Sequence, residues 1–193
     1  MTHDSLQNLN TLEQLDVHGE LFHADTRLEI YNSTKQTEPQ WRFVSDQVMG
    51  GQSHGQVNFH QPAESSESAC HCLSGLVSLE NRGGFLQMQL IDLDQLAINF
   101  ADYDGIFIEV KGNQHIYNLH LKTSQLQFPW QSFRMNFQAS PRWQRLFLPF
   151  QDFVAHRTST SLNPNKIKRL GILAIGEVFT ADICIRALGV YKA

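Results

Sequence analysis

The residues best placed to do chemistry lie between positions 41 and 55, in the stretch WRFVSDQVMGGQSHG. Asp46 and Ser53 flank two adjacent glycines, and both side chains can accept hydrogen bonds from the N–H groups of a turn. Gly50 and Gly51 can adopt positive φ or let another backbone pass closely, because they carry no Cβ. A run of N–H groups bent in this way can also cradle an anion or a sugar hydroxyl.

A structural role for this turn is the favoured interpretation, because double-glycine turns are common in all-β proteins. Val48 and Met49 are then expected to point into the core. The alternative is a ligand site made by the turn itself, and the residues expected to contribute to it are Asp46, Met49, Gly50, Gly51 and Ser53.

A second double glycine, in ENRGGF, offers a partner segment for this turn. If the two segments meet, we expect Arg82 to form an ion pair with Asp46 and to pin them together. Arg82, Gly83 and Gly84 therefore join the candidate site residues.

Catalytic arrangements are weak in this sequence. Asp46 with Asp102 or Asp104 could form an acid/base couple for hydrolysis, but all three lie in turns, where Asp is favoured for bonding its own backbone. No cysteine stands in a recognisable activated setting for nucleophilic catalysis. We expect no catalytic residue and a protein that is not an enzyme.

The cysteines and histidines do not define a metal site. Cys70 and Cys72 fall on one face of a strand and His71 on the other, and no second Cys-x-x-Cys or His-x-x-x-His supplies the remaining zinc ligands. Together with Cys184 these make three cysteines, a number that is too small and odd for a disulfide framework. We therefore expect the cysteines to be packed as small core residues. The scattered histidines, His120 among them, are expected to be surface or satisfied residues. Neither a metal nor another cofactor is expected.

Two further segments carry aromatic or basic side chains. In QLQFPWQSF, burial of Phe128 and Trp130 in the core is favoured, with an exposed aromatic platform for a sugar or a protein as the alternative. The cations of NKIKRL are interpreted as the solvated edge of a strand. With 15 basic and 19 acidic residues the chain carries a net charge of -4, which argues against a nucleic-acid partner.

The elements that must position these residues are strands. From about residue 27 apolar and polar residues alternate, as in GIFIEV, YNLHLK and FRMNFQ, and turn signals separate the runs at short intervals. This pattern predicts an all-β antiparallel sandwich or barrel over residues 27–193. Residues 1–26 are expected to form an extension packed on it, with a short helix in DSLQNLNTLEQL or an irregular segment. LGILAI and DICIRALGVY are apolar on both faces, which indicates central strands.

No apolar run is long enough to span a bilayer, and the N-terminus resembles neither a secretory nor a mitochondrial leader. These features favour a cytoplasmic protein.

The turn WRFVSDQVMGGQSHG resembles the signature of the complex I intermediate-associated protein 30 family, whose hallmark is an Asp-x-Val-Met-Gly-Gly-x-Ser turn. Further blocks are similar in order: LSGLVSLENRGGF, YDGIFIEVKG with YNLHLK, WQRLFLPFQDF, and IKRLGILAIG with ICIRALGVY. The resemblance runs from about residue 28 to the C-terminus. Gly112, Asn113 and Gln114 depart from it, because the family usually has Gly-Asp-Gly there.

The resemblance implies a galactose-binding-like jelly roll, a fold shared with carbohydrate-binding modules. It also implies a non-catalytic assembly or chaperone-like factor, whose partner would be a subunit of the respiratory NADH:ubiquinone oxidoreductase. A sugar- or small-ligand-binding module, which would use Trp130, is the alternative, and a hydrolase with paired carboxylates is third. Because the N-terminus does not resemble a transit peptide, the resemblance implies a bacterial, cytoplasmic relative of the mitochondrial members, with peripheral membrane attachment through a partner left open.

Overall fold

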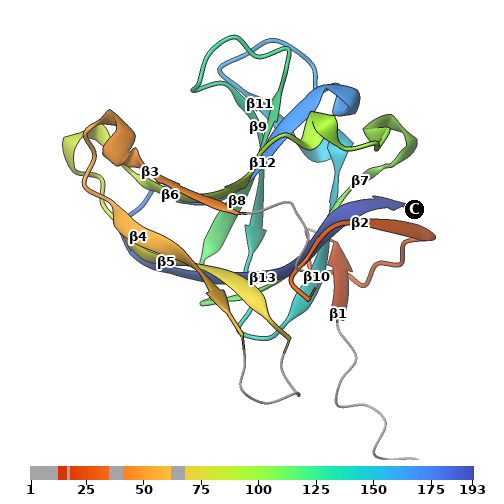
Figure 1. The fold of residues 1–193 in the computed structure, drawn as a ribbon, viewed down its shortest axis with the longest axis horizontal. Coiled ribbons are helices and arrows are strands. Elements are labelled where there is room, and N and C mark those ends of the chain that lie inside the picture. Colours follow the sequence, from red (N-terminus) through yellow and green to blue (C-terminus); the bar gives the residue numbers. More distant parts are fainter. Residues whose placement is uncertain (1–12, 17, 35–40, 62–67) are drawn as a thin grey trace, which may run out of the picture.

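The computed structural model describes residues 13–16, 18–34, 41–61 and 68–193, and its strands form two sheets that lie face to face (Figure 1). The seven strands of sheet A are β1 (Glu13–Asp16), β2 (Thr26–Asn32), β4 (His54–His60), β5 (Cys70–Val77), β7 (Gly105–Gly112), β10 (Gln144–Pro149) and β13 (Phe179–Lys192). The six strands of sheet B are β3 (Arg42–Ser45), β6 (Phe85–Leu90), β8 (Ile116–Thr123), β9 (Ser132–Gln138), β11 (Val154–His156) and β12 (Ile167–Ile175). Short 3-10 helices punctuate the loops: η1 (Asp46–Met49), η2 (Glu80–Arg82), η3 (Leu93–Gln95), η4 (Phe100–Asp102), η5 (Phe150–Asp152) and η6 (Pro164–Lys166).

The strand order is β1-β10-β7-β13-β5-β4 in sheet A, with β2 also paired to β13, and β11-β9-β8-β12-β6-β3 in sheet B. Apart from the parallel pair β1–β10, the strand pairings are antiparallel. The predicted fold class, an antiparallel β-sandwich, is confirmed.

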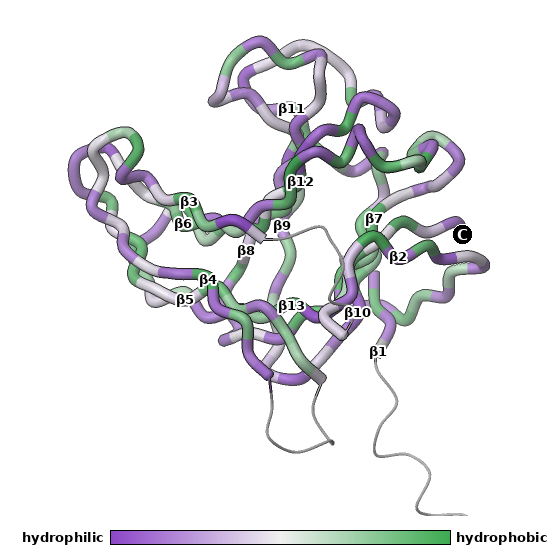
Figure 2. The backbone as a smooth tube through the Cα atoms, in the orientation of Figure 1, coloured by the Kyte–Doolittle hydropathy of each residue, from purple (hydrophilic) through white to green (hydrophobic). Residues whose placement is uncertain are grey.

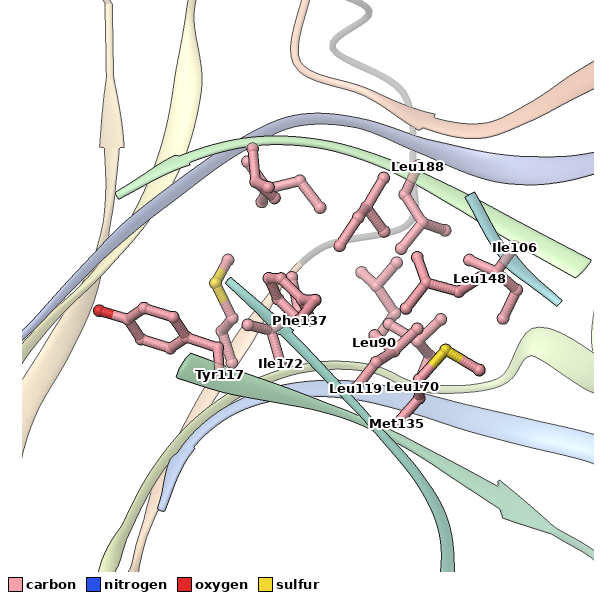
Figure 3. Packing of buried hydrophobic residues seen from close by; sticks show 14 of the residues in the cluster. Leu90, Ile106, Tyr117, Leu119, Met135, Phe137, Leu148, Leu170, Ile172 and Leu188 are labelled. Carbon is pink, nitrogen blue, oxygen red and sulfur yellow. The ribbon is translucent and has the colours of Figure 1, made fainter. Parts of the chain in front are cut away.

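The core lies between the two sheets, because strands such as β8 and β9 alternate apolar and polar residues and turn the apolar ones inward. Figure 2 shows hydrophobic and hydrophilic stretches interspersed along the backbone. In the close-up of Figure 3, Ile106, Leu148 and Leu188 of sheet A face residues of sheet B such as Leu119 and Leu170. The side chains between the buried residues of a strand therefore point to the outer face of its sheet.

The apolar strands β12 and β13 are central, as predicted: β12 lies between β8 and β6, and β13 between β7 and β5. The three cations of NKIKRL are exposed, as the interpretation of a solvated edge requires, but the strand that carries Lys168 and Arg169 is not an edge strand. Arg169 lies on β12, with β8 and β6 on either side, and its charge is presented from the middle of sheet B.

The described part of the N-terminal extension packs on the outer face of sheet A. Strand β1 extends this sheet beside β10, and the Phe22 ring lies 4.6 Å from that of Phe147 and 5.4 Å from that of Tyr191. The helix predicted in DSLQNLNTLEQL is wrong at its C-terminal end, because Glu13–Asp16 is a strand. The rest of that helix prediction lies outside the described residues.

Candidate functional site

Asp46 is the centre of a buried hydrogen-bond network between two loops. It begins η1, after β3, and its side chain is 0% exposed. Its Oδ1 accepts from the Ser53 N–H at 3.0 Å, while its Oδ2 accepts from the Ser53 hydroxyl at 2.5 Å and from the backbone N–H groups of Gly84 and Phe85. Ser53 continues the network, because its Oγ accepts from the Ser78 N–H at 2.9 Å. The loops on either side of β4 and β5 are thus joined through one carboxylate.

Two of the predicted glycines are required by the volume of this carboxylate. A Cβ on Gly51 would lie 2.3 Å from the Asp46 Cγ, and one on Gly83 would lie 2.4 Å from its Oδ2. Gly50 ends η1 with φ of 86°, in the left-handed region that favours glycine. The two double-glycine segments thus meet, and Asp46, Gly51, Ser53, Gly83 and Gly84 lie in one cluster.

The other predictions for this turn are corrected by the structure. Arg82 is exposed and forms no ion pair with Asp46, whose partners come from Ser53 and the backbone that follows Arg82. Val48 and Met49 are 74% and 68% exposed, so they do not fill the core. They stand on the outside of a turn whose interior is polar.

The chemistry of Asp46 is that of an ionised structural carboxylate. Burial by itself raises the pKa of this carboxyl, but the hydrogen bonds from the Ser53 hydroxyl and the N–H groups of Gly84, Phe85 and Ser53 outweigh it, so its pKa lies below the ordinary value. Asp104 lies beside the C-terminus, where its Oδ2 accepts from the Ala193 N–H at 2.8 Å. The turn after β3, which Asp46 begins, and the C-terminus lie at opposite ends of the view in Figure 1, so the hypothesised couple of Asp46 with Asp104, or with Asp102 two residues before it, is wrong.

The outer face of sheet B carries a set of polar side chains that the turn motif did not predict. In β8, Leu119 and Leu121 enter the core, so His120 and Lys122 point outward. The same alternation places on this face, from the other strands, Arg42, Gln87, Gln89, Arg134, Asn136, His156 and Arg169. This polar face of sheet B is the larger candidate for a ligand surface.

Gly171, which has no side chain, leaves room at the centre of the polar face for a neighbouring side chain. A Cβ on this residue would lie 2.0 Å from the Gln87 Nε2, so the Gln87 side chain occupies the space above β12. His120 is the neighbour of Gly171 on β8. Its side chain is 5% exposed, and its Nε2 is buried with no hydrogen-bond partner in the described part of the chain. The expectation of a surface or satisfied histidine is therefore wrong for His120.

Trp130 lies beside the polar face, in the loop between β8 and β9. Its ring stacks on that of Phe128, with centroids 4.8 Å apart and an interplanar angle of 6°, and the two side chains are 52% and 48% exposed. Core burial was the favoured prediction, and it is wrong; the alternative, an exposed aromatic platform, describes the structure. Lys122 fixes this loop by donating to the carbonyl oxygens of Pro129 and Gln131.

The cysteines are also different from what was expected. Cys72 of β5 and Cys184 of β13 are cross-strand partners and form a disulfide. Cys70 remains outside this bond, with its Sγ 3.6 Å from that of Cys72. The sequence indicated small buried residues because the pairing depends on the register of two strands that are 112 residues apart.

These two sheets, which lie face to face, define an antiparallel β-sandwich. The chain belongs to the complex I intermediate-associated protein 30 (CIA30) family, whose model matches residues 31–183. Together the family and the fold support a binding module. No helix of the described residues is long and apolar enough to cross a membrane.

The likeness to solved structures extends over most of the chain. The family 11 carbohydrate-binding module of the cellulase Lic26A-Cel5E of Clostridium thermocellum has a TM-score of 0.68 and 10% identity, over 89% of this chain and 97% of that one. A family 11 module from the same organism, in complex with a β-1,3-1,4-mixed-linked tetrasaccharide, has a TM-score of 0.65 and 10% identity, over 86% and 95%. At this identity the likeness shows the fold alone. No curated protein matches the chain.

Proposed function

We propose that this protein is a non-catalytic binding protein that holds an oligosaccharide on the polar face of sheet B. The observation that carries the proposal is the stacked, exposed pair of Phe128 and Trp130 beside that face. A flat aromatic surface can pack on the C–H face of a sugar ring, and the amides and basic groups of the sheet can bond its hydroxyls. The sandwich fold, which carbohydrate-binding modules share, supports the same function.

Calorimetric titration with oligosaccharides tests the proposal. Trp130→Ala is expected to lose at least about tenfold in affinity, the equivalent of about 1.4 kcal/mol, without a change in the urea midpoint, because half of the side chain is exposed. Phe59→Ala is the matched control: Phe59 is 49% exposed, but it lies on β4 of sheet A. Equal affinities for wild type and Trp130→Ala, or no binding of any oligosaccharide at millimolar concentration, would contradict the proposal.

The second candidate is an assembly or chaperone-like factor with a protein partner, and family membership favours it. One surface supports it too. The loops that Asp46 joins expose Val48, Met49 and Leu79, whose side chains are 74%, 68% and 49% exposed. We call these three residues the apolar tip. Large apolar side chains exposed together are typical of protein contacts.

Affinity purification from the native host separates the two candidates. An assembly factor should recover subunits of a respiratory complex, and Met49→Glu should lose them while Phe59→Ala retains them. If wild type and Met49→Glu recover the same proteins, the apolar tip is not the contact surface. Recovery of no respiratory subunit by the wild type would argue against this candidate.

A further inference from the structure

Sheet B carries only positive charge. Its six strands contain no Asp or Glu within their bounds, and their basic residues are Arg42, Lys122, Arg134, Lys168 and Arg169. The chain as a whole carries a net charge of -4, so acidic residues are in excess elsewhere. A sheet with one sign of charge in a protein of the opposite net sign requires a separate explanation.

In sheet A, partly buried cations are paired with a carboxylate of the same sheet. Glu109 is 7% exposed; its Oε1 accepts from the Arg145 Nε at 2.8 Å and its Oε2 from the Arg186 Nε at 2.9 Å. In sheet B, Lys168 has such a partner, Asp94, at 3.3 Å. Among the described residues, no carboxylate forms an ion pair with Lys122, Arg134, Arg157 or Arg169.

These cations converge on one place on the polar face. Arg169 of β12 is the cross-strand neighbour of Lys122 on β8. His156 of β11 is the neighbour of Ser132 on β9. The Arg134 Nε donates to the Ser132 Oγ at 2.8 Å, which turns its guanidinium toward the same row. We call Lys122, Arg134, His156, Arg157 and Arg169 the cationic row.

The electrostatic state of the row agrees with this geometry. Burial first, and then the charges of Arg134 and Arg169, lower the pKa of Lys122 to about 8. Burial, followed by Arg134, Arg157 and Lys122, lowers the pKa of His156. Burial, with Arg134, Lys122 and His156 after it, lowers the pKa of His120 to about 3, so this ring is neutral under the row. Like charges on neighbouring strands destabilise a sheet, and a bound anion would relieve that repulsion.

Hydrogen bonds connect the loop that carries Phe128 and Trp130 to the cationic row. The Lys122 amino group donates to the carbonyl oxygens on either side of Trp130, those of Pro129 and Gln131. The Gln131 Nε2 in turn donates to the Arg157 carbonyl oxygen at 3.1 Å. A ligand that packs on Trp130 therefore lies within reach of fixed positive charges.

We propose that the ligand of the polar face is an acidic oligosaccharide, whose carboxylate or sulfate groups pair with Arg134, Arg157 and Arg169 while a sugar ring packs on the Phe128–Trp130 pair. The proposal rests on the proposed function and adds the charge of the ligand to it. Guanidinium groups suit both kinds of anion, because their N–H groups form a planar fork. Lys122 sets the potential and holds the loop.

The test compares, by calorimetric titration, probes of equal length that differ in charge and in backbone. Two are acidic saccharides, oligogalacturonate and a sulfated galactan oligomer; two are neutral saccharides, a galactan oligomer and a β-glucan oligomer; and one is an acidic peptide, hexaglutamate. We expect at least one of the two acidic saccharides to bind with an affinity about ten or more times that of either neutral saccharide, because it gains at least one charge-assisted contact. Sodium chloride should weaken the acidic complex, since salt screens exposed charges. The two acidic arms distinguish carboxylate from sulfate recognition.

Variants locate the binding. Arg169→Gln and Arg157→Gln, which change exposed residues, should each weaken the acidic complex about tenfold. Lys192→Gln, at the end of β13 in sheet A, is the control and should bind as the wild type does. Unchanged affinity in both arginine variants would overturn the site.

The remaining outcomes separate this inference from the proposed function. Neutral saccharides that bind as tightly as acidic ones would overturn the inference and leave the proposed function in place. No binding of any saccharide would overturn both. Hexaglutamate bound as tightly as the acidic saccharides would also overturn the inference, because it would assign the row to an acidic protein segment.

Discussion

The Asp46 carboxylate accepts a hydrogen bond from the backbone N–H of Gly84, 38 residues further along the chain. This contact joins the loop after β3 to the turn before β6, and Ser53, at the other end of the loop that Asp46 begins, completes the network. Because the carboxylate is buried and its acceptor positions are occupied by the protein's own donors, the turn at Asp46 is a structural joint that holds two loops together. The surfaces available for ligands lie around it.

Asp46→Asn is expected to lower the free energy of unfolding by about 3 kcal/mol, because hydrogen bonds to a charged group contribute roughly 1.5–3 kcal/mol each and an amide nitrogen cannot accept them. Urea denaturation measures this loss. Asp102→Asn is the matched control, since Asp102 is exposed at the end of η4 and its variant should stay within about 0.5 kcal/mol of wild type. Equal stability of the two variants would contradict the joint.

The pH dependence of the stability difference between wild type and Asp46→Asn provides a second measurement. The folded pKa of Asp46 is depressed, so its contribution is present above the unfolded pKa of about 3.9 and is lost as the pH falls through the lower folded value. The stability difference between wild type and Asp46→Asn should therefore shrink below about pH 4. A difference that is independent of pH between 2 and 5 would mean that the lost stability does not come from the charge.

Local patterns were sufficient for the fold, and long-range pairing explains what was missed. Alternation in YNLHLK predicted a half-buried strand, and it already distinguished Leu119 and Leu121 from His120 and Lys122. It could not show that Arg134 and Arg169 come from other strands and meet Lys122 on one face, because that depends on strand order. The signal that could have found the row was the absence of Asp and Glu from FRMNFQ, YNLHLK and IKRLGILAI.

The glycine pairs offer a sharper test of the joint than the acid does. Gly51→Ala would place a Cβ 2.3 Å from the Asp46 Cγ, and overpacking of this kind costs about 1–3 kcal/mol. Gly50→Ala meets no atom within 4 Å but has φ of 86°, which costs roughly 1–2 kcal/mol for a residue with a Cβ.

We therefore expect Gly51→Ala to have a lower urea midpoint than Gly50→Ala, and Asp46→Ala to reduce this difference, because it removes the Cγ and the oxygen that a Cβ on residue 51 would meet. In the Asp46→Ala background the cost of Gly51→Ala should be smaller than in the wild type, since the effects of neighbouring residues are not additive. Additive losses in the double variant would show that the two residues do not meet.

The disulfide between Cys72 and Cys184 can be tested by counting thiols. In denaturant without reductant one thiol, that of Cys70, should react, and after reduction all three cysteines should react. Replacing both bonded cysteines with serine should cost about 2–4 kcal/mol, because the cross-link restricts the unfolded chain. Cys70→Ser, the control, should leave no reactive thiol until reductant is added. Three reactive thiols in the unreduced protein would contradict the bond.

The lowered pKa of Lys122 predicts that the folding stability rises with pH in the alkaline range. Its pKa is lowered to about 8 in the folded protein, by burial and then by Arg134 and Arg169, against about 10.4 in an unfolded chain. Between these two values the unfolded state binds more protons than the folded state, so stability rises with pH. The neutral amine keeps two N–H groups, enough for the carbonyl oxygens of Pro129 and Gln131. Loss of the charge thus removes repulsion without loosening the loop.

Urea midpoints at pH 7.5 and 9.5 measure this effect, and Lys122→Arg is the matched variant because arginine stays charged across that range. The wild type should gain stability relative to Lys122→Arg as the pH rises. Lys192→Arg is the control for lysine replacement on sheet A, and its difference from wild type should not vary with pH. If the midpoints of wild type and Lys122→Arg shift in parallel, the charge on Lys122 is not opposed by its neighbours, and the electrostatic argument for an anionic ligand loses its support.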